Sequence, residues 1–289
     1  MAVPTFDSIP DREYDPRLYA PVAEVEPIAS LAEFGPAQME QYRTLGFVSV
    51  ANVIDPERNI RIVKSLLRLA DEVPEGICVQ FESAAEQDVL NLPIEERQDY
   101  IRKYMAFVKF DDVLCDLAYD PEILSVIERL LKDKDPTVDG VELFQDMALF
   151  KPPGIGREKP WHQDHAYFNV PEGTPVIGIW MALDEANLEN GCMVFQPGGH
   201  LDGPVPHFSR RDWQICDSDV LAKGGSVAAP LPAGGALIFD GLTPHGTPSN
   251  RSGQRRRAIQ FHYIPKGTPR TTTEERMRIF GSEGRDVSC

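Results

Sequence analysis

The sequence predicts a mainly β fold, an antiparallel sandwich or jelly roll with helices packed outside one sheet. After Pro136 the chain consists of short apolar runs separated by Pro, Gly and Asn, a pattern typical of antiparallel β folds. Before Pro136, apolar residues recur at helical spacing. The expected strands are Val141–Lys151, Val176–Leu183, Cys192–Gln196, Ala236–Phe239 and Ala258–Ile264.

The elements before Pro136 follow from caps and periodicity. Pro36 begins a short helix over 36–45 and Gly46 ends it, and a short strand follows at 47–50. Asp55 caps an amphipathic helix over 56–73. Further helical regions are expected at about 83–92, 112–118 and 121–132, an irregular, proline-rich arm at 1–35 and a loop at 224–235.

Composition excludes several classes of function. The chain has 289 residues and a formal net charge of −16, which argues against nucleic acid and anionic membranes as partners. No run approaches the ~18 apolar residues that a membrane span needs. Five widely spaced cysteines and the lack of an apolar leader in the first thirty residues favour reduced thiols and a cytoplasmic location.

The run Trp161-His162-Gln163-Asp164 carries the first chemical signal. Residues two apart on an extended strand point to the same face, so His162 and Asp164 can act together. Two histidines and one carboxylate with open positions opposite form the site of non-heme Fe(II) oxygenases. His245, far downstream at the border of an expected strand, is the candidate third ligand.

Arg256 carries the second signal. It lies eleven residues after His245 and shares one strand face with residues 258, 260 and 262. An arginine that points inward needs an anion, because burying it unpaired is costly. A dicarboxylate co-substrate would supply that anion and would pair with the guanidinium through two hydrogen bonds. His262, on the same face, is the remaining histidine best placed to support the site.

These segments resemble the phytanoyl-CoA dioxygenase family of Fe(II)/2-oxoglutarate oxygenases over roughly residues 36–266. The resemblance rests on order and spacing as well as on identity. Its carriers are Phe150-Lys151-Pro152-Pro153-Gly154, Trp161-His162-Gln163-Asp164, Trp180-Met181-Ala182-Leu183-Asp184, Asn190-Gly191-Cys192-Met193, Gln196-Pro197-Gly198-Gly199-His200, and His245-Gly246-Thr247 with Asn250, Ser252, Arg256 and Ala258.

The resemblance implies a double-stranded β-helix, a cupin-like jelly roll, with its core at about 137–266 of a single oxygenase domain over 36–289. It also implies roles by position. His162, Asp164 and His245 match the iron ligands, and Arg256 matches the partner of the distal carboxylate of 2-oxoglutarate. Thr247 stands beside this arginine, at a position where the family more often has a serine. Further co-substrate contacts are expected from Met147, Trp180, Gln145 and Lys103.

The activity implied is that of an Fe(II)/2-oxoglutarate-dependent dioxygenase acting on a small organic molecule. Fe(II) would be the cofactor, 2-oxoglutarate and O2 the co-substrates, and ascorbate a candidate stimulant. Because Asp164 is present, hydroxylation is favoured over halogenation. Two alternatives stay open: a cupin-type metal isomerase or epimerase that does not use 2-oxoglutarate, and a catalytically inactive binding module. The sequence also leaves the oligomeric state open between monomer and homodimer.

Overall fold

The computed structural model describes residues 5–8 and 13–281. Its longer helices begin where the sequence supplies a cap. The carboxylates of Asp55 and Asp120 accept backbone N–H groups at the starts of two of them, and proline occupies the first turn of both. The α-helices are α1 (Pro36–Leu45), α2 (Pro56–Glu72), α3 (Ile94–Arg97), α4 (Asp112–Ala118), α5 (Pro121–Lys134), α6 (Asp217–Lys223) and α7 (Thr273–Phe280).

The strands include two long ones, β7 and β16, that run side by side through the middle of the larger sheet. The strands are β1 (Thr5–Phe6), β2 (Ala23–Glu24), β3 (Ile28–Ser30), β4 (Phe47–Asn52), β5 (Gln80–Phe81), β6 (Ile101–Met105), β7 (Val141–Lys151), β8 (Lys159–His162), β9 (Ile177–Ala182), β10 (Met193–Phe195), β11 (His207–Ser209), β12 (Trp213–Ile215), β13 (Val227–Ala229), β14 (Ala236–Asp240), β15 (His245–Thr247) and β16 (Arg256–Pro265).

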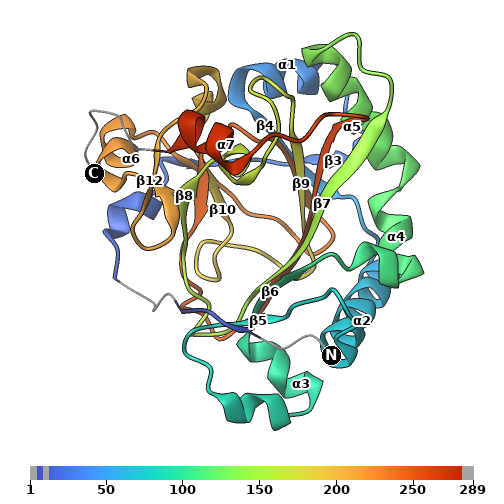
Figure 1. Cartoon of the computed structure of the whole chain (residues 1–289), viewed down its shortest axis with the longest axis vertical. Helices are drawn as coiled ribbons and strands as arrows, with labels where there is room; N and C mark the ends of the chain where they lie inside the picture. The colour runs from blue at the N-terminus through green and yellow to red at the C-terminus, as the bar shows by residue number, and fades with distance from the viewer. Residues whose placement is uncertain (1–4, 9–12, 282–289) are drawn as a thin grey trace.

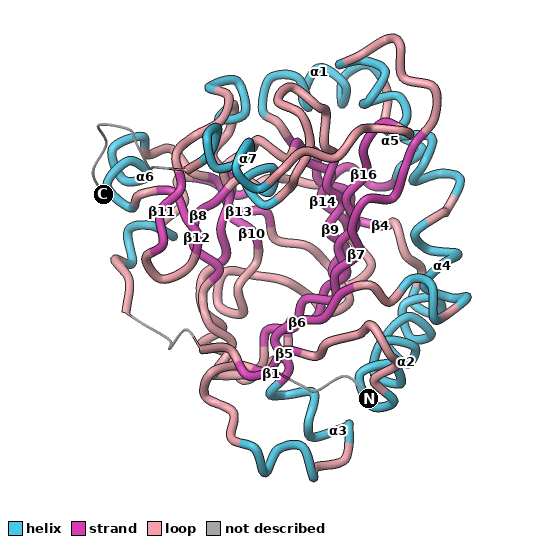
Figure 2. The backbone as a smooth tube through the Cα atoms, viewed as in Figure 1, coloured by secondary structure: helices cyan, strands magenta, loops and turns pink. Residues whose placement is uncertain are grey.

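Two mixed sheets face each other, and helices flank them (Figure 1). The larger has nine strands in the order β1-β5-β6-β7-β16-β9-β14-β4-β3, and the smaller has five in the order β2-β13-β10-β15-β8. Figure 2 shows α2, α4 and α5 along the side of the larger sheet, with α6 on the opposite side of the molecule. The expected mainly β architecture with flanking helices is confirmed.

Alternation along β16 shows how one strand serves two environments. Ile259, Phe261 and Tyr263 belong to the apolar core that the larger sheet shares with the helices. Residues 256, 258, 260 and 262 point the other way, into the space between the sheets, because successive side chains of a strand face opposite sides. The inner face therefore carries Arg256, Gln260 and His262, while Ile259, Phe261 and Tyr263 anchor the outer face in the core.

Two elements differ from expectation. The helix expected at about 83–92 is wrong, since only a 3-10 turn forms there (Gln87–Asn91), and Pro93 follows two residues later. The segment expected as a loop at 224–235 contains β13, because pairing with β10 draws it into the smaller sheet. In the second case pairing with a distant strand overrides the local pattern.

Three short strands from the described part of residues 5–35 attach this segment to the body. β1 pairs with β5, β2 with β13 and β3 with β4, all in parallel. Cys115 and Cys192 are free thiols, but Cys216 is disulfide-bonded, so the reduced state expected for all five cysteines is wrong for Cys216. Cys289 lies outside the described residues. Within the described part of the chain, no helix combines the length and the apolar character that crossing a membrane requires.

Candidate functional site

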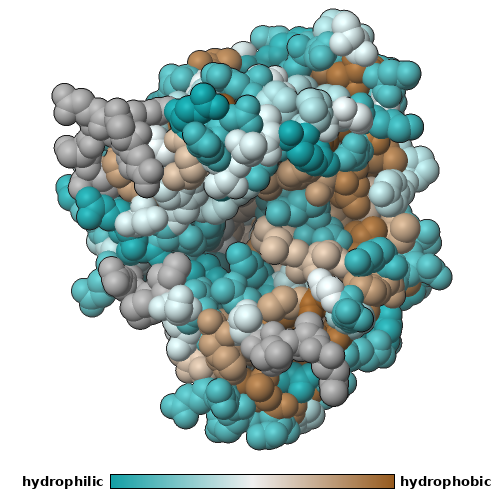
Figure 3. All heavy atoms as spheres, in the orientation of Figure 1, coloured by the Kyte–Doolittle hydropathy of each residue, from teal (hydrophilic) through white to brown (hydrophobic). Residues whose placement is uncertain are grey.

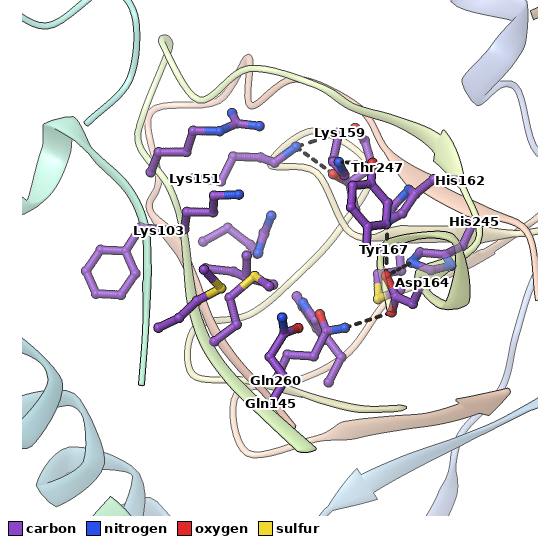
Figure 4. Close-up of a pocket in the computed structure, with 18 of the residues that line it drawn as sticks. Lys103, Gln145, Lys151, Lys159, His162, Asp164, Tyr167, His245, Thr247 and Gln260 are labelled. Carbon is purple, nitrogen blue, oxygen red and sulfur yellow. Dashed lines mark hydrogen bonds and ion pairs between the residues drawn. The ribbon is translucent and has the colours of Figure 1, made fainter. Parts of the chain in front are cut away.

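Three side chains with metal-binding chemistry converge between the two sheets (Figure 4). His162 ends β8, Asp164 begins the next 3-10 turn, and His245 begins β15. The two histidines are brought together because β8 and β15 pair with His245 opposite His162. One ligand atom from each residue lies within 4.8 Å of the other two, and all three residues are buried. Asp164 Oδ1 is 3.2 Å from His162 Nε2 and 3.8 Å from His245 Nε2.

The backbone fixes which nitrogen each histidine offers. Nδ1 of His162 lies 2.8 Å from the carbonyl oxygen of Pro160, and Nδ1 of His245 lies 2.9 Å from that of Thr243. A carbonyl only accepts, so each Nδ1 carries the hydrogen and each Nε2 keeps a free lone pair. Burial lowers the pKa of His245 to about 3, which keeps that ring neutral. A neutral imidazole held in this way is the state that a metal ion requires of a histidine ligand.

Asp164 is held by its other oxygen. Its Oδ2 accepts hydrogen bonds from Nε2 of His262 at 2.8 Å and from Nε2 of Gln260 at 2.9 Å. Burial would raise the pKa of this carboxyl, but the neighbouring histidines and the hydrogen bond from His262 hold it well below its usual value. Oδ1 is left facing the two Nε2 atoms.

Arg256 is a buried cation, and some of its hydrogen-bond donors have no partner among the described residues. It is 3% exposed, and its Nε and Nη1 are buried without a hydrogen-bond partner in the part of the chain that the structure describes. Its Cζ lies 5.3 Å from the centroid of the Trp180 ring. Burial lowers the pKa of Arg256 to about 10, which leaves the guanidinium charged at neutral pH. A buried, unpaired guanidinium on a cavity wall is a site for an anion.

Thr247 lies beside this anion site, and a buried lysine orients it. Nζ of Lys151 donates to Oγ1 of Thr247 at 2.8 Å. Because the lysine occupies an acceptor position of the hydroxyl, the hydroxyl hydrogen is available to a different acceptor. Burial, followed by the positive charge of Arg256, lowers the pKa of Lys151 well below its usual value.

A cavity of about 300 Å³ connects these groups. Figure 3 shows a hollow near the middle of the face that it draws, with hydrophilic and hydrophobic residues around it. The cavity wall contains all the residues that the sequence analysis proposes for iron or 2-oxoglutarate: His162, Asp164, His245, Arg256, Thr247, Trp180, Met147, Gln145 and Lys103. Strand register brings several of them together, since Gln260 on β16 lies between Met147 on β7 and Trp180 on β9.

The cavity is rich in cations although the whole chain is acidic. Its wall includes Arg102, Lys103, Lys151, Arg157, Lys159 and Arg256. Some are neutralised locally. Arg102 and Arg157 pair with Asp7, and Lys159 pairs with Asp212 at 3.0 Å. Burial, followed by Lys159 and Arg102, lowers the pKa of Lys103 to about 8.

Among the cavity residues that sequence reasoning missed are Lys151, Gln260, Lys159 and Tyr167, which contact the candidate site or support a residue that does. Two of them could have been found from the sequence. Lys151 belongs to the Phe150–Gly154 motif of the family resemblance, and Gln260 shares a strand face with Arg256. No sequence pattern indicated Lys159 or Tyr167. Nζ of Lys159 donates to the hydroxyl of Tyr167 at 2.8 Å, and the Tyr167 ring packs edge-on against His162 with centroids 5.7 Å apart. That contact depends on tertiary placement.

Comparison with known proteins gives one family. The family model described as Phytanoyl-CoA dioxygenase (PhyH) matches residues 42–258. A Danio rerio protein named Phytanoyl-CoA dioxygenase domain-containing protein 1 is 28% identical over 261 residues, covering 78% of this chain and 88% of that protein.

Solved structures show a shared fold. The epimerase SnoN, in complex with Fe3+, alpha ketoglutarate and nogalamycin RO, has a TM-score of 0.64 at 22% identity, covering 83% of this chain and 88% of SnoN. EctD from S. alaskensis, with 2-oxoglutarate and 5-hydroxyectoine, has a TM-score of 0.63 at 20% identity, covering 96% of this chain and 92% of EctD.

Proposed function

The chain belongs to the phytanoyl-CoA dioxygenase family, and from this membership we propose that it is an Fe(II)/2-oxoglutarate-dependent dioxygenase. The observation that carries the proposal is one cavity that holds both a His-Asp-His group and a buried arginine whose Nε and Nη1 have no partner among the described residues. A metal site alone fits many reactions. A metal site together with an anion site fits a co-substrate that binds both, as 2-oxoglutarate does.

The donor set fits Fe(II). Two neutral imidazoles and one carboxylate are the ligands of non-heme Fe(II) oxygenases, and here His162, Asp164 and His245 would hold the ion. When bound, Fe(II) with O2 supplies the oxidising chemistry, in which 2-oxoglutarate becomes succinate and CO2 and a C–H bond of the substrate is oxidised, most simply by hydroxylation. Ascorbate is proposed as a stimulant of this reaction.

The protein's own contribution is to position the co-substrate and to exclude water. Arg256 would pair with the distal carboxylate of 2-oxoglutarate through its unpaired Nε and Nη1. Thr247, oriented by Lys151, would donate its hydroxyl hydrogen to the same carboxylate. Trp180 supports the guanidinium from one side. Met147, Gln145 and Lys103 stay predicted co-substrate contacts, since their place on the cavity wall is compatible with that role.

If Lys103 contacts 2-oxoglutarate, the KM for this co-substrate should depend on pH. The pKa of Lys103 is lowered to about 8 by burial and by the nearby Lys159 and Arg102. A lysine is charged below its pKa and neutral above it, so a lysine contact to 2-oxoglutarate weakens as pH rises through that value. Losing one charge-assisted hydrogen bond costs about 1.5–3 kcal/mol. Because the charged fraction of Lys103 falls about tenfold between about pH 7 and about pH 9, we expect KM for 2-oxoglutarate to rise by about five- to tenfold over that range.

Steady-state succinate release at a series of pH values measures this dependence. In Lys103→Met, KM should already be high at about pH 7 and should change little as pH rises. An equally steep rise of KM in Lys103→Met would remove Lys103 from the co-substrate site.

The remaining proposals concern the fold and the setting. We propose that the two facing sheets form a double-stranded β-helix and that residues 36–289 make one oxygenase domain, a choice supported by the family match. The substrate would be a small organic molecule, because the cavity holds about 300 Å³ for substrate and co-substrate together. A cytoplasmic location stays a prediction.

One alternative outcome has specific support. SnoN is an epimerase whose structure contains Fe3+ and alpha ketoglutarate. An epimerisation that uses the same iron and co-substrate sites is therefore compatible with this cavity. A metal isomerase that does without 2-oxoglutarate would give no reason for the unpaired Arg256.

Succinate release tests the proposed function directly. Purified protein supplied with Fe(II), 2-oxoglutarate and O2 should release succinate. EDTA should stop the release, and excess Fe(II) should restore it. Release that EDTA leaves unchanged would exclude a metal-dependent reaction.

A further inference from the structure

Strand β16 brings two donors to one oxygen of the candidate metal ligand Asp164. Gln260 and His262 lie two positions apart on the inner face of the strand, four and six residues after Arg256. Their Nε2 atoms lie 2.9 and 2.8 Å from Oδ2 of Asp164. Figure 4 shows Gln260 directed at Asp164 from the side of the cavity that also contains Gln145. The same strand thus contributes to the anion site and to the metal site.

The chemistry of the acceptor fixes the hydrogens on both partners. An ionised carboxylate only accepts, so His262 must carry its hydrogen on Nε2, and Gln260 must present its amide nitrogen. The two nitrogens lie 3.0 Å apart, so the two donors approach Oδ2 side by side. Nδ1 of His262 is correspondingly buried without a hydrogen-bond partner among the described residues.

Packing leaves His262 little freedom to release Asp164. The residue is 1% exposed, and its ring contacts Phe168 edge-on with centroids 4.8 Å apart. The Phe239 ring contacts the His262 ring from a second direction, with centroids 6.4 Å apart. Gln260 is also buried, and strands β7 and β9 flank it on both sides. Both donors are therefore fixed before any ion binds.

We propose that Gln260 and His262 are positioning residues that restrict Asp164 to a single ligand oxygen, Oδ1. The inference rests on the proposed function, in which Asp164 is an iron ligand. With Oδ2 occupied by two hydrogen bonds, only Oδ1 faces His162 and His245. A carboxylate that bound through both oxygens would take one more position on the ion. That position is needed by 2-oxoglutarate or O2, so the two donors keep the site open.

Cobalt binding to the metal-free protein tests this role without relying on activity. Co(II) is the probe, because its visible absorption reports both its affinity and its coordination. Groups that orient a metal ligand typically change metal affinity by about 10- to 100-fold when they are removed. We expect His262→Leu and Gln260→Met each to weaken Co(II) binding by about that factor and to change the spectrum. His262→Gln, which keeps a donor, should recover part of the loss.

Controls separate this effect from a general loss of structure. His200→Leu removes another buried histidine, whose Nε2 faces the carbonyl of Arg43 outside the cavity, and it should bind Co(II) as the parent does. Thermal unfolding of each metal-free variant shows that it is folded. If His262→Leu does not fold, Gln260→Met carries the test.

The outcomes distinguish this inference from the proposed function. If the parent binds Co(II) but both variants have its affinity and spectrum, Asp164 needs no such restraint and the inference is overturned. A parent protein that does not bind Co(II) at all would instead overturn the metal site itself.

Discussion

Replacing His245 by alanine should abolish metal binding and succinate release together. His245 offers a neutral Nε2 that the carbonyl of Thr243 fixes from the other side of the ring, and alanine has no atom to replace it. Even removal of a group that only orients a ligand costs about 10- to 100-fold in metal affinity, so the loss of a ligand should exceed about 100-fold. Equilibrium binding of Fe(II) or Co(II) to the metal-free variant measures the effect.

The same experiment requires a histidine that does not bind the metal. His200→Ala serves, because His200 lies outside the cavity wall and contacts the backbone of Arg43. It should keep the parent's metal affinity. Unchanged metal affinity in His245→Ala would show that the group of His162, Asp164 and His245 is not the metal site, whatever its geometry.

Arg256→Ala should weaken 2-oxoglutarate while leaving the metal in place. The guanidinium has two buried donors without partners, and each charge-assisted hydrogen bond that it makes to a carboxylate is worth about 1.5–3 kcal/mol. That range corresponds to about 10- to 150-fold per bond. KM for 2-oxoglutarate should therefore rise at least about tenfold. Succinate release against 2-oxoglutarate concentration, with metal affinity measured in parallel, gives both quantities.

The neighbouring Arg257 provides the matched control. Its guanidinium pairs with Asp184 at 2.6 Å and lies outside the cavity wall. Arg257→Ala therefore removes an arginine from the same strand without touching the proposed anion site. Equal KM values for the parent and Arg256→Ala would contradict the assignment of this arginine to the co-substrate.

Much of the site could be predicted from the sequence because its residues follow strand periodicity. Residues 256, 258, 260 and 262 were expected on one face, and the structure turns them to the interior between the sheets. The expected partnership of His162 and Asp164 depends on the same rule. β8 ends at His162, but Gln163 keeps an extended backbone, so Asp164 returns to the side of His162.

The residues that escaped prediction depend on contacts between distant segments. Lys151 reaches Thr247 across 96 positions of the chain, and no local pattern records that contact. Likewise β13 forms in a glycine- and proline-rich segment because it pairs with β10, which lies more than thirty residues earlier in the chain. Periodicity predicts which face a residue occupies, whereas tertiary packing decides what meets it.

The most direct test of the account is an anaerobic titration of Fe(II) into the metal-free protein in the presence of 2-oxoglutarate. The account holds that one cavity binds the ion through His162, Asp164 and His245 and the co-substrate through Arg256. It predicts that the weak visible charge-transfer band of the iron–2-oxoglutarate chelate appears with the parent protein and is lost in His162→Ala. Fe(II) that binds without producing the band would contradict the account and would favour a metal isomerase that does not use 2-oxoglutarate.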